Sequence, residues 1–262
     1  MQHFFDSHCH LDARAFDADR SAVLSRAGDA GIVALILPAT TVESWPEISA
    51  LSQQHAHLHP AYGLHPMFIA QHQEQHLDAL ERRLHEPGGA AAIGECGLDY
   101  FIPNPDRSRQ RYFFHAQLDI AKHAQLPVIV HARRALDEVL AALRQQSGLR
   151  GVIHSFSGSR QQAWQLLDLG FYLGMGGPVT YPRAQRLRNI AATMPLEFLL
   201  LETDSPDQPD IDWRGQRNEP ARLPRIGIEI ARLRGISQGE LAHTTHINAN
   251  RLFLSRKNMP KQ

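Results

Sequence analysis

The chain has 262 residues, of which 43% are hydrophobic, and its 27 acidic side chains balance its 27 lysines and arginines. This length is enough for one large domain with a substantial core, and we expect a single domain over residues 1–262. The charge balance argues against a protein held to nucleic acid by bulk charge. A nucleic-acid substrate would have to be bound locally, at a site.

Compartment and membrane signals are few. The N-terminus lacks a basic region followed by an apolar core, and no apolar run approaches the length of a membrane span. Two cysteines, Cys9 and Cys96, do not make a disulfide framework. We therefore expect no signal peptide, no membrane association and a cytoplasmic protein.

Short apolar runs alternate with longer amphipathic stretches. We expect strands from residue 4 and at 33–38, 58–64, 90–95, 127–131, 151–154, 171–175 and 196–204. Helices are expected at 17–30, 43–54, 74–85, 106–124, 136–145, 160–169, 183–193, 220–234 and 238–254. Eight strands, each followed by a helix, predict an α/β protein with the (β/α)8 TIM barrel fold. A doubly wound open sheet is the alternative, but it would need a Gly-rich phosphate turn after the first strand, and the sequence has none there.

His8 and His10 follow the first strand with one residue between them. Successive side chains of a strand point to opposite faces, so the two imidazoles share a face and could bind one metal ion. The pattern alone is weak, because a chain with 16 histidines will contain such triplets by chance, and residues 55–59 hold two more. His72 and His76 lie four apart among glutamines, which is typical of a solvated helix face.

Other strand ends strengthen the metal hypothesis. In a barrel of this kind the catalytic residues lie at the carboxyl ends of the strands. Five expected strands end in potential ligands, which are His8, His10, Glu95, His131, His154 and Asp204. A single histidine at a strand end is more often a packing residue, whereas four imidazoles and two carboxylates at one face favour a metal site.

Six ligands exceed what one ion needs, since an open catalytic zinc site keeps about three protein ligands. Two ions about 3.5–4 Å apart, sharing a bridging carboxylate, use the set better and predict hydrolysis by a metal-activated water. Mixed imidazole and carboxylate ligands do not choose sharply among zinc, manganese and magnesium.

Six segments, in order between residues 4 and 254, resemble the TatD family of metal-dependent deoxyribonucleases, which are amidohydrolase-like barrels. They are residues 5–12 (FDSHCHLD), 94–100 (GECGLDY), 127–133 (PVIVHAR), 154–159 (HSFSGS), 201–206 (LETDSP) and 217–220 (RNEP). The resemblance implies two divalent ions per chain. It assigns one ion to His8, His10, Glu95 and Asp204, and the other to Glu95, His131 and His154. It also implies hydrolysis of phosphodiester bonds in DNA, often from an end.

One departure from the family pattern bears on the substrate. Residues 207–209 (DQP) replace the aromatic residue usual after the Glu-Thr-Asp-Ser-Pro stretch. Together with residues 176–181 (GGPVTY), this departure indicates a less characterised subgroup of the family.

Catalytic and substrate roles can be proposed for a few residues. Asp204 is expected both to bind metal and to take the proton from the attacking water, and Glu95 to bridge the ions. Arg133, two residues after His131, would point into the site if its strand continues, where a guanidinium suits a phosphate. A surface salt bridge is the alternative. His65, at the end of the third strand, is a second candidate for contact with a phosphate.

Aromatic and cysteine side chains have simpler interpretations. Phe156, Tyr181 and Trp213 could stack on bases, but packing is the more economical role for each. Cys9 and Cys96 neighbour ligands in sequence, so they should face away from the site as small buried hydrophobes. They lie on strands that are not adjacent, so no disulfide between them is expected.

We therefore predict a binuclear metal-dependent hydrolase of phosphodiester bonds, specifically a TatD-type deoxyribonuclease with exonuclease-like action on DNA or a small phosphodiester. We expect a monomer without an obligate protein partner. One alternative is an amidohydrolase acting on a C–N or C–O bond of a small molecule. Many such enzymes bridge their ions with a carboxylated lysine at the end of strand four, where this chain has Glu95, and none of its three lysines ends a strand. A metal-storing or scaffolding barrel is the third possibility.

Overall fold

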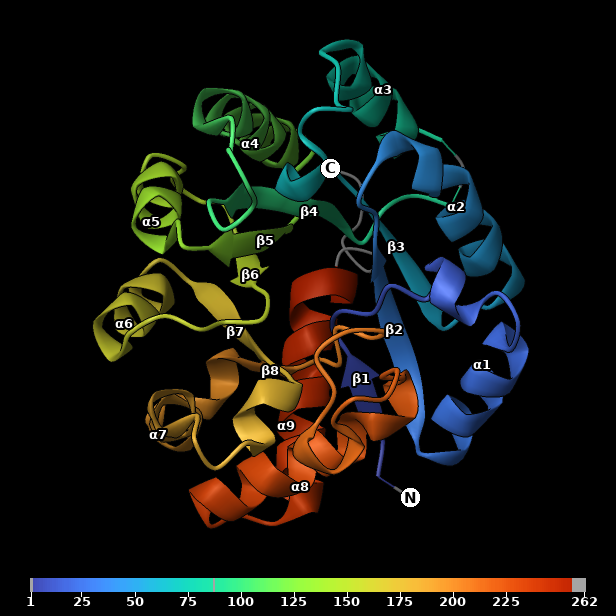
Figure 1. Cartoon of the computed structure of the whole chain (residues 1–262), viewed down its shortest axis with the longest axis vertical. Helices are drawn as coiled ribbons and strands as arrows, with labels where there is room; N and C mark the ends of the chain where they lie inside the picture. The colour runs from blue at the N-terminus through green and yellow to red at the C-terminus, as the bar shows by residue number, and fades with distance from the viewer. Residues whose placement is uncertain (1, 87, 256–262) are drawn as a thin grey trace. The chain divides into compact units, whose positions relative to one another are not determined.

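The computed structural model describes residues 2–86 and 88–255 (Figure 1). Within these residues one eight-stranded sheet has the strand order β1 to β8, following the sequence. The chain divides into two compact units. The first unit comprises residues 1–35 and 173–262, and the second comprises residues 36–172.

The first unit contains both ends of the strand order. Its elements are β1 (Phe4–Asp6), α1 (Arg20–Asp29), the start of β2 (Ile32–Pro38), the end of β7 (Phe171–Met175), α7 (Gln185–Thr193), β8 (Leu199–Leu201), α8 (Leu223–Arg234) and α9 (Gln238–Ala249). The pairs β1–β2 and β7–β8 are parallel. Helix α9, red in Figure 1, packs against β1 and β8.

Backbone hydrogen bonds close the sheet inside the first unit. The Ser7 amide donates to the Leu201 carbonyl at 2.9 Å, and the Asp204 amide donates to the His8 carbonyl at 2.9 Å. Cys9 and Ser205 form a further parallel bridge. The last strand therefore pairs with the first, and this closure together with the strand order confirms the predicted (β/α)8 TIM barrel.

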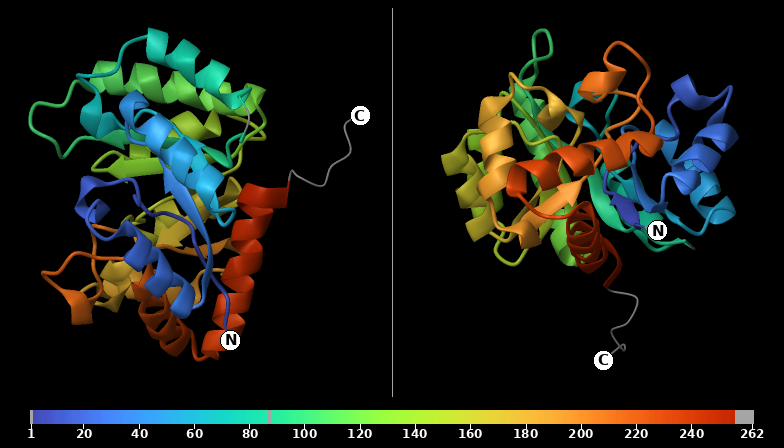
Figure 2. Two further views of the ribbon diagram at one scale, coloured as in Figure 1. Left: turned by 90° about the vertical axis from the view of Figure 1, so that its right-hand side faces the viewer. Right: turned by 90° about the horizontal axis from the view of Figure 1, so that it is seen from below.

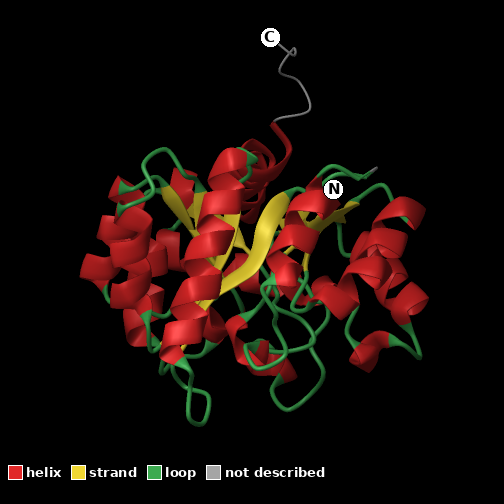
Figure 3. Ribbon diagram, turned by 90° about the horizontal axis from the view of Figure 1, so that it is seen from above, coloured by secondary structure: helices red, strands yellow, loops and turns green. Residues whose placement is uncertain are grey.

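The second unit continues the alternation of strand and helix, drawn yellow and red in Figure 3. Its elements are the end of β2, α2 (Trp45–Gln54), β3 (Leu58–Tyr62), α3 (Gln75–Leu84), β4 (Ala92–Asp99), α4 (Arg107–His123), β5 (Val128–Arg133), α5 (Leu136–Arg144), β6 (Gly151–Ile153), α6 (Arg160–Asp168) and the start of β7. Helices α3 and α4 pack side by side (Figure 2).

Short helical turns connect many of these elements. They are the 3-10 helices η1 (Arg14–Phe16), η2 (Val42–Ser44), η3 (Pro66–Phe68), η4 (Gly177–Thr180), η5 (Leu196–Phe198), η6 (Ile211–Trp213) and η7 (Pro220–Arg222), and the π-helix η8 (Asn250–Leu254). No helix among the described residues is both long and apolar enough to cross a membrane.

Local sequence signals account for several element ends. Ser159 accepts a hydrogen bond from the Gln162 amide while the Gln162 side chain accepts one from the Ser159 amide, a capping box that begins α6. Gly235 ends α8 with a left-handed φ of 67°, which glycine adopts at little cost. The strands supply the core, and every residue of β4 is buried.

Two strands, β4 and β8, differ most from the predicted ranges. Strand β4 runs four residues beyond Glu95, because Gly97 and Asp99 keep pairing with His131 and Arg133 of β5. Strand β8 is shorter than residues 196–204, because residues 196–198 form η5 after Pro195 and the Thr203 amide donates to the Asp6 carboxylate. Both differences lie where ligands are predicted.

Candidate metal centre

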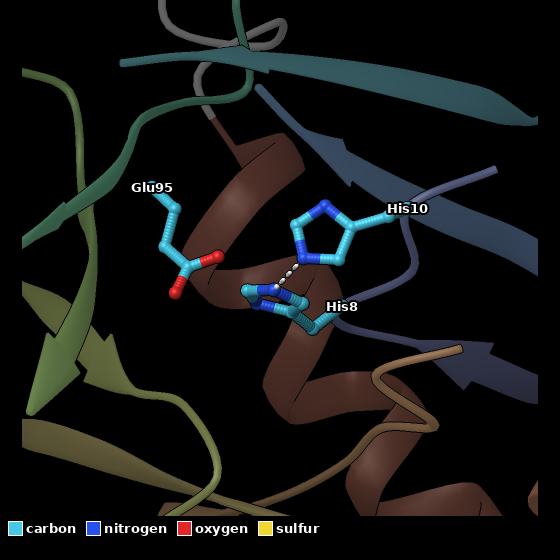
Figure 4. A group of neighbouring side chains, drawn as sticks. All are labelled: His8, His10 and Glu95. Atoms are coloured by element: carbon cyan, nitrogen blue, oxygen red, sulfur yellow. Dashed lines mark hydrogen bonds between the residues drawn. The ribbon is translucent and has the colours of Figure 1, made fainter. Parts of the chain in front are cut away.

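Three predicted ligands meet within the first unit, and we call His8, His10 and Asp204 the first cluster. The Nε2 atoms of His8 and His10 are 3.2 Å apart, as the dashed line in Figure 4 shows. Asp204 Oδ1 lies 3.5 Å from His8 Nε2 and 3.6 Å from His10 Nε2. His8 is fully buried, whereas His10 is partly exposed, so the cluster has one solvent-accessible side.

A buried polar network holds the first cluster in place. The Asp6 carboxylate accepts hydrogen bonds from the His8 amide (3.2 Å), the Thr203 amide (3.0 Å) and the Thr203 hydroxyl (2.6 Å). Burial raises the pKa of Asp6 to about 7, against the lowering effect of these bonds. Asp6 therefore joins the β1 end, which carries His8, to the β8 end, which carries Asp204.

The second unit contains a second cluster, which we define as Glu95, His131 and His154. Glu95 Oε1 lies 2.9 Å from His131 Nδ1 and 2.7 Å from His154 Nε2, and those two nitrogens are 3.1 Å apart. Glu95 comes from the buried middle of β4, His131 from β5, and His154 directly follows β6. Three neighbouring strands thus bring the ligands together.

His65 also contacts the second cluster. Its Nδ1 accepts a hydrogen bond from the Met67 amide at 3.0 Å, so a neutral His65 carries its proton on Nε2. That Nε2 lies 3.0 Å from Glu95 Oε1 and can donate to it, and burial keeps the ring neutral by lowering its pKa. His65 satisfies the distances of a ligand group with Glu95 and His131, but its tautomer favours a donor that orients the Glu95 carboxylate.

Asp99 is a site residue that sequence reasoning missed. Its Oδ2 lies 3.1 Å from His131 Nε2, and its Oδ1 accepts a hydrogen bond from the Phe101 amide at 2.8 Å. A carboxylate on one imidazole nitrogen fixes the tautomer and leaves the other nitrogen for a metal. Burial would lower the pKa of His131, but the hydrogen bonds that the ring makes to the Asp99 and Glu95 carboxylates outweigh burial and raise that pKa. The alternation of residues 95, 97 and 99 on one strand face was the available signal.

Both clusters have dimensions that fit a metal ion. Two ligands about 2.0–2.2 Å from one tetrahedral ion lie roughly 3.3–3.6 Å apart. In the first cluster the edges of 3.5 and 3.6 Å fall in this range, and the edge of 3.2 Å lies just below it. The second cluster, with edges of 2.7, 2.9 and 3.1 Å, would open by about 0.2–0.6 Å to hold such an ion. Buried imidazole and carboxylate groups so close together suit a divalent cation.

Other predicted residues can now be located. Strand β5 reaches Arg133, as the phosphate hypothesis requires, and the side chain is exposed. Phe156 is buried, which supports its packing role, and both cysteines are buried and free. The prediction for His72 was wrong. That ring is buried because its Nε2 donates to the His65 carbonyl at 2.8 Å, which steadies the η3 turn.

A (β/α)8 barrel with buried histidine and carboxylate clusters after its strands defines the class of metal-dependent hydrolases. Comparison with known proteins names the family. A model described as "TatD related DNase" matches residues 5–254. The chain therefore belongs to the TatD-related DNase family of metal-dependent hydrolases.

Individual relatives agree with this assignment. A metal-dependent hydrolase of Escherichia coli K12, YjjV, is 40% identical over 252 residues, covering 95% of this chain and 97% of that protein. Its crystal structure superposes with a TM-score of 0.92 over 98% of both chains. A protein of Erwinia tasmaniensis named "3′-5′ ssDNA/RNA exonuclease TatD" is 35% identical over 261 residues, covering 95% of this chain and 99% of that protein. A phosphotriesterase homology protein of E. coli, 15% identical with a TM-score of 0.64, shares the fold alone.

Proposed function

We propose that this protein is a binuclear metal-dependent phosphodiesterase that hydrolyses DNA, as a deoxyribonuclease acting from a strand end. The observation that carries the proposal is the pair of ligand clusters, each with the dimensions of a metal site. Similarity to the Erwinia protein named as a single-strand exonuclease supports the choice of substrate.

Two divalent ions, zinc, manganese or magnesium, are proposed for the two clusters. His8, His10 and Asp204 would hold one ion, and His131 and His154 the other. Because strands of a closed parallel barrel end at one face, we propose that Glu95 bridges the two ions. The hydrogen bond from His65 supports this role, since it would orient a shared carboxylate.

Separate catalytic and substrate-binding roles are proposed for residues of the site. Divalent ions, when bound, supply Lewis acidity to the phosphodiester and to the attacking water. Asp204 is proposed to accept the proton of that water, because its Oδ1 faces both first-cluster imidazoles and its side chain is 11% exposed. Arg133 is proposed to contact the substrate phosphate. His65 is not, because the Met67 amide and the Glu95 carboxylate already engage both of its ring nitrogens.

The charge of the protein sets an expectation for substrate binding. A chain with zero net charge should bind DNA with a modest salt dependence and little base specificity. A single strand or a strand end enters a barrel mouth more readily than a duplex. We also propose a cytoplasmic monomer with a single domain over residues 1–262, and the two free cysteines support a reducing compartment.

An activity screen tests this proposal. The metal-loaded protein is assayed against single-stranded DNA, duplex DNA, RNA, bis(p-nitrophenyl) phosphate, and a panel of amides and lactones. We expect hydrolysis of the phosphodiesters, with single-stranded DNA preferred over duplex DNA. Good turnover of an amide or lactone without turnover of any phosphodiester would instead assign the amidohydrolase alternative.

A further inference from the structure

The loop after β4 carries an exposed aromatic ring next to two arginines. Phe101 is 47% exposed. The guanidinium of Arg133 lies 3.8 Å from the centre of the Phe101 ring, and that of Arg134 lies 4.4 Å from it. Both arginines are themselves exposed. An exposed aromatic ring with two adjacent positive charges is the combination that binds a base and its phosphate in single-stranded nucleic acids.

This platform, defined as Phe101, Arg133 and Arg134, is tied directly to the second cluster. Asp99 Oδ1 accepts a hydrogen bond from the Phe101 amide, and Asp99 Oδ2 contacts the His131 imidazole. The Tyr100 amide donates to the Arg133 carbonyl at 2.9 Å, which joins the two loops that carry the platform. One carboxylate therefore links the backbone of Phe101 to a proposed metal ligand.

The arginines are available for a ligand. Among residues 2–86 and 88–255, neither Arg133 nor Arg134 forms an ion pair. Arg134 has a left-handed φ of 54°, which is uncommon for a residue other than glycine, asparagine or aspartate. Such backbone conformations cluster at binding sites, where the surrounding structure holds them in place. Here the conformation accompanies the placement of a second guanidinium on the same ring.

We propose that this platform is a subsite for the nucleotide next to the cleaved bond of a single strand. Phe101 stacks on its base, and Arg133 and Arg134 contact the adjoining phosphates. The subsite rests on the proposed function, because it assumes a polynucleotide substrate. It would add affinity without base specificity, since every base offers a π-face.

Phe101→Ala tests the stacking role with two substrates of different size. Bis(p-nitrophenyl) phosphate offers one phosphodiester without a nucleobase, whereas a pentathymidylate reaches the subsite. We expect KM for the pentathymidylate to rise roughly 5- to 100-fold, as loss of one base stack predicts. The kcat/KM for bis(p-nitrophenyl) phosphate should stay within about twofold. An equal loss on both substrates, or no loss on either, would overturn the subsite.

Conservative variants separate stacking from loop packing. Phe101→Trp should restore a low KM for the pentathymidylate, whereas Phe101→Leu, which keeps an apolar contact but no ring, should not. Full rescue by leucine would mean that Phe101 only packs against the arginines. Tyr112→Ala is the matched control, because Tyr112 is 49% exposed on α4, outside the strand-end loops. It should leave both substrates unaffected.

Salt dependence tests the arginines. Each phosphate contact to a single strand contributes about 0.7 to the slope of log affinity against log salt. The double variant Arg133→Gln/Arg134→Gln should therefore lower the slope for oligothymidylate binding by about 1.4. Arg150→Gln is the control, because Arg150 is exposed just before β6, at the amino ends of the strands. An unchanged slope in the double variant would exclude the arginines from the subsite.

A binding measurement distinguishes failure of the subsite from failure of the proposed function. If the wild-type protein hydrolyses no phosphodiester, the proposed function is wrong, and the fluorescence anisotropy of a labelled decathymidylate still tests the platform. Wild-type binding that Phe101→Ala weakens roughly 5- to 100-fold would support the platform. Absence of wild-type binding, or equal binding by the variant, would overturn it.

Discussion

At Asp204, metal binding and proton transfer can be separated by replacing one oxygen. Asp204→Asn keeps the size of the side chain and one oxygen ligand but cannot accept the proton of water. Because the other ligands remain, metal content should fall little while turnover drops by roughly 10²–10⁴. Metal content, substrate affinity and rate should be measured on one preparation. Loss of both ions would make Asp204 chiefly structural, and near-normal turnover with both ions present would place the base elsewhere.

At His131, the Asp99 carboxylate should set the pH range of metal binding. A proton on His131 competes with a metal ion, and because the pKa of this histidine is raised, competition begins at a higher pH than for an ordinary histidine. Metal affinity should therefore fall as the pH drops through the pKa of His131. Asp99→Asn removes the charge that raises this pKa, so the fall should move to lower pH.

Isothermal titration calorimetry of the second-cluster ion between about pH 5.5 and 8 measures this shift. We expect the Asp99→Asn curve to move to the acid side and the affinity at neutral pH to weaken about 10- to 100-fold, as loss of an outer carboxylate usually does. Asp119→Asn is the matched control, because Asp119 is an exposed carboxylate on α4 that accepts a hydrogen bond from the Gln146 side chain. An Asp99→Asn curve that coincides with wild type would remove Asp99 from the site.

At the residue scale, the sequence predicted which side chains lie close together where chemistry and strand ends coincide, and their metal ligation stays a prediction. Glu95, His131 and His154 were brought together as expected, because each ends or follows an apolar run. Asp99 was missed because its role depends on β4 continuing past Glu95. Phe101 was missed because an exposed aromatic residue in a polar loop has no periodic pattern, and its arginine neighbours come from another strand.

At the scale of the strand, Gly97 sets how closely β4 approaches β5. A Cβ on Gly97 would lie 2.0 Å from the His131 carbonyl oxygen, and its φ of 141° disfavours other residues. Gly97→Ala should therefore push the strands apart at the ligand itself, costing about 1–3 kcal/mol of stability and weakening the second ion. Denaturant unfolding and metal titration measure the two effects.

A second glycine offers a matched control, for which we expect a change in stability of the opposite sign. Gly28 lies in α1, and a Cβ there would meet nothing within 4 Å. Gly28→Ala should stabilise the protein by up to about 1 kcal/mol, because alanine favours a helix over glycine. Equal stability changes for Gly97→Ala and Gly28→Ala would contradict the close approach of β4 to β5.

The elements were predicted from the alternation of apolar strands and amphipathic helices, and their order proved correct. The ends of the strands were less predictable, because the hydrogen bonds between paired strands stop for reasons that the local sequence pattern does not contain. A glycine at position 97 would ordinarily predict a turn. In the structure it lets β4 continue beside His131, because it has no Cβ to collide with the His131 backbone. Thr203 is a residue type that favours strands. Its amide and hydroxyl instead donate hydrogen bonds to the Asp6 side chain, and β8 has already ended.

For the whole molecule, metal binding should contribute to thermal stability. A ligand present at about 100 times its Kd stabilises the native state by about 2.7 kcal/mol, which is roughly 5–10 °C in a chain of this size. Thermal denaturation with metal and after chelation measures this shift. Glu95→Ala should abolish most of it and reduce both ions, since Glu95 is the proposed bridge. Two tightly bound ions in that variant would make the bridge assignment wrong.

The central claim, two ions serving phosphodiester hydrolysis, is tested most directly by metal content and cleavage on one preparation. The protein is reconstituted with excess zinc, manganese or magnesium, freed of unbound metal, and divided between elemental analysis and a single-stranded DNA assay. We predict about two ions per chain and release of nucleotides that stops on chelation and returns with metal. At most one ion after reconstitution, or two ions with no cleavage of any phosphodiester, would contradict it.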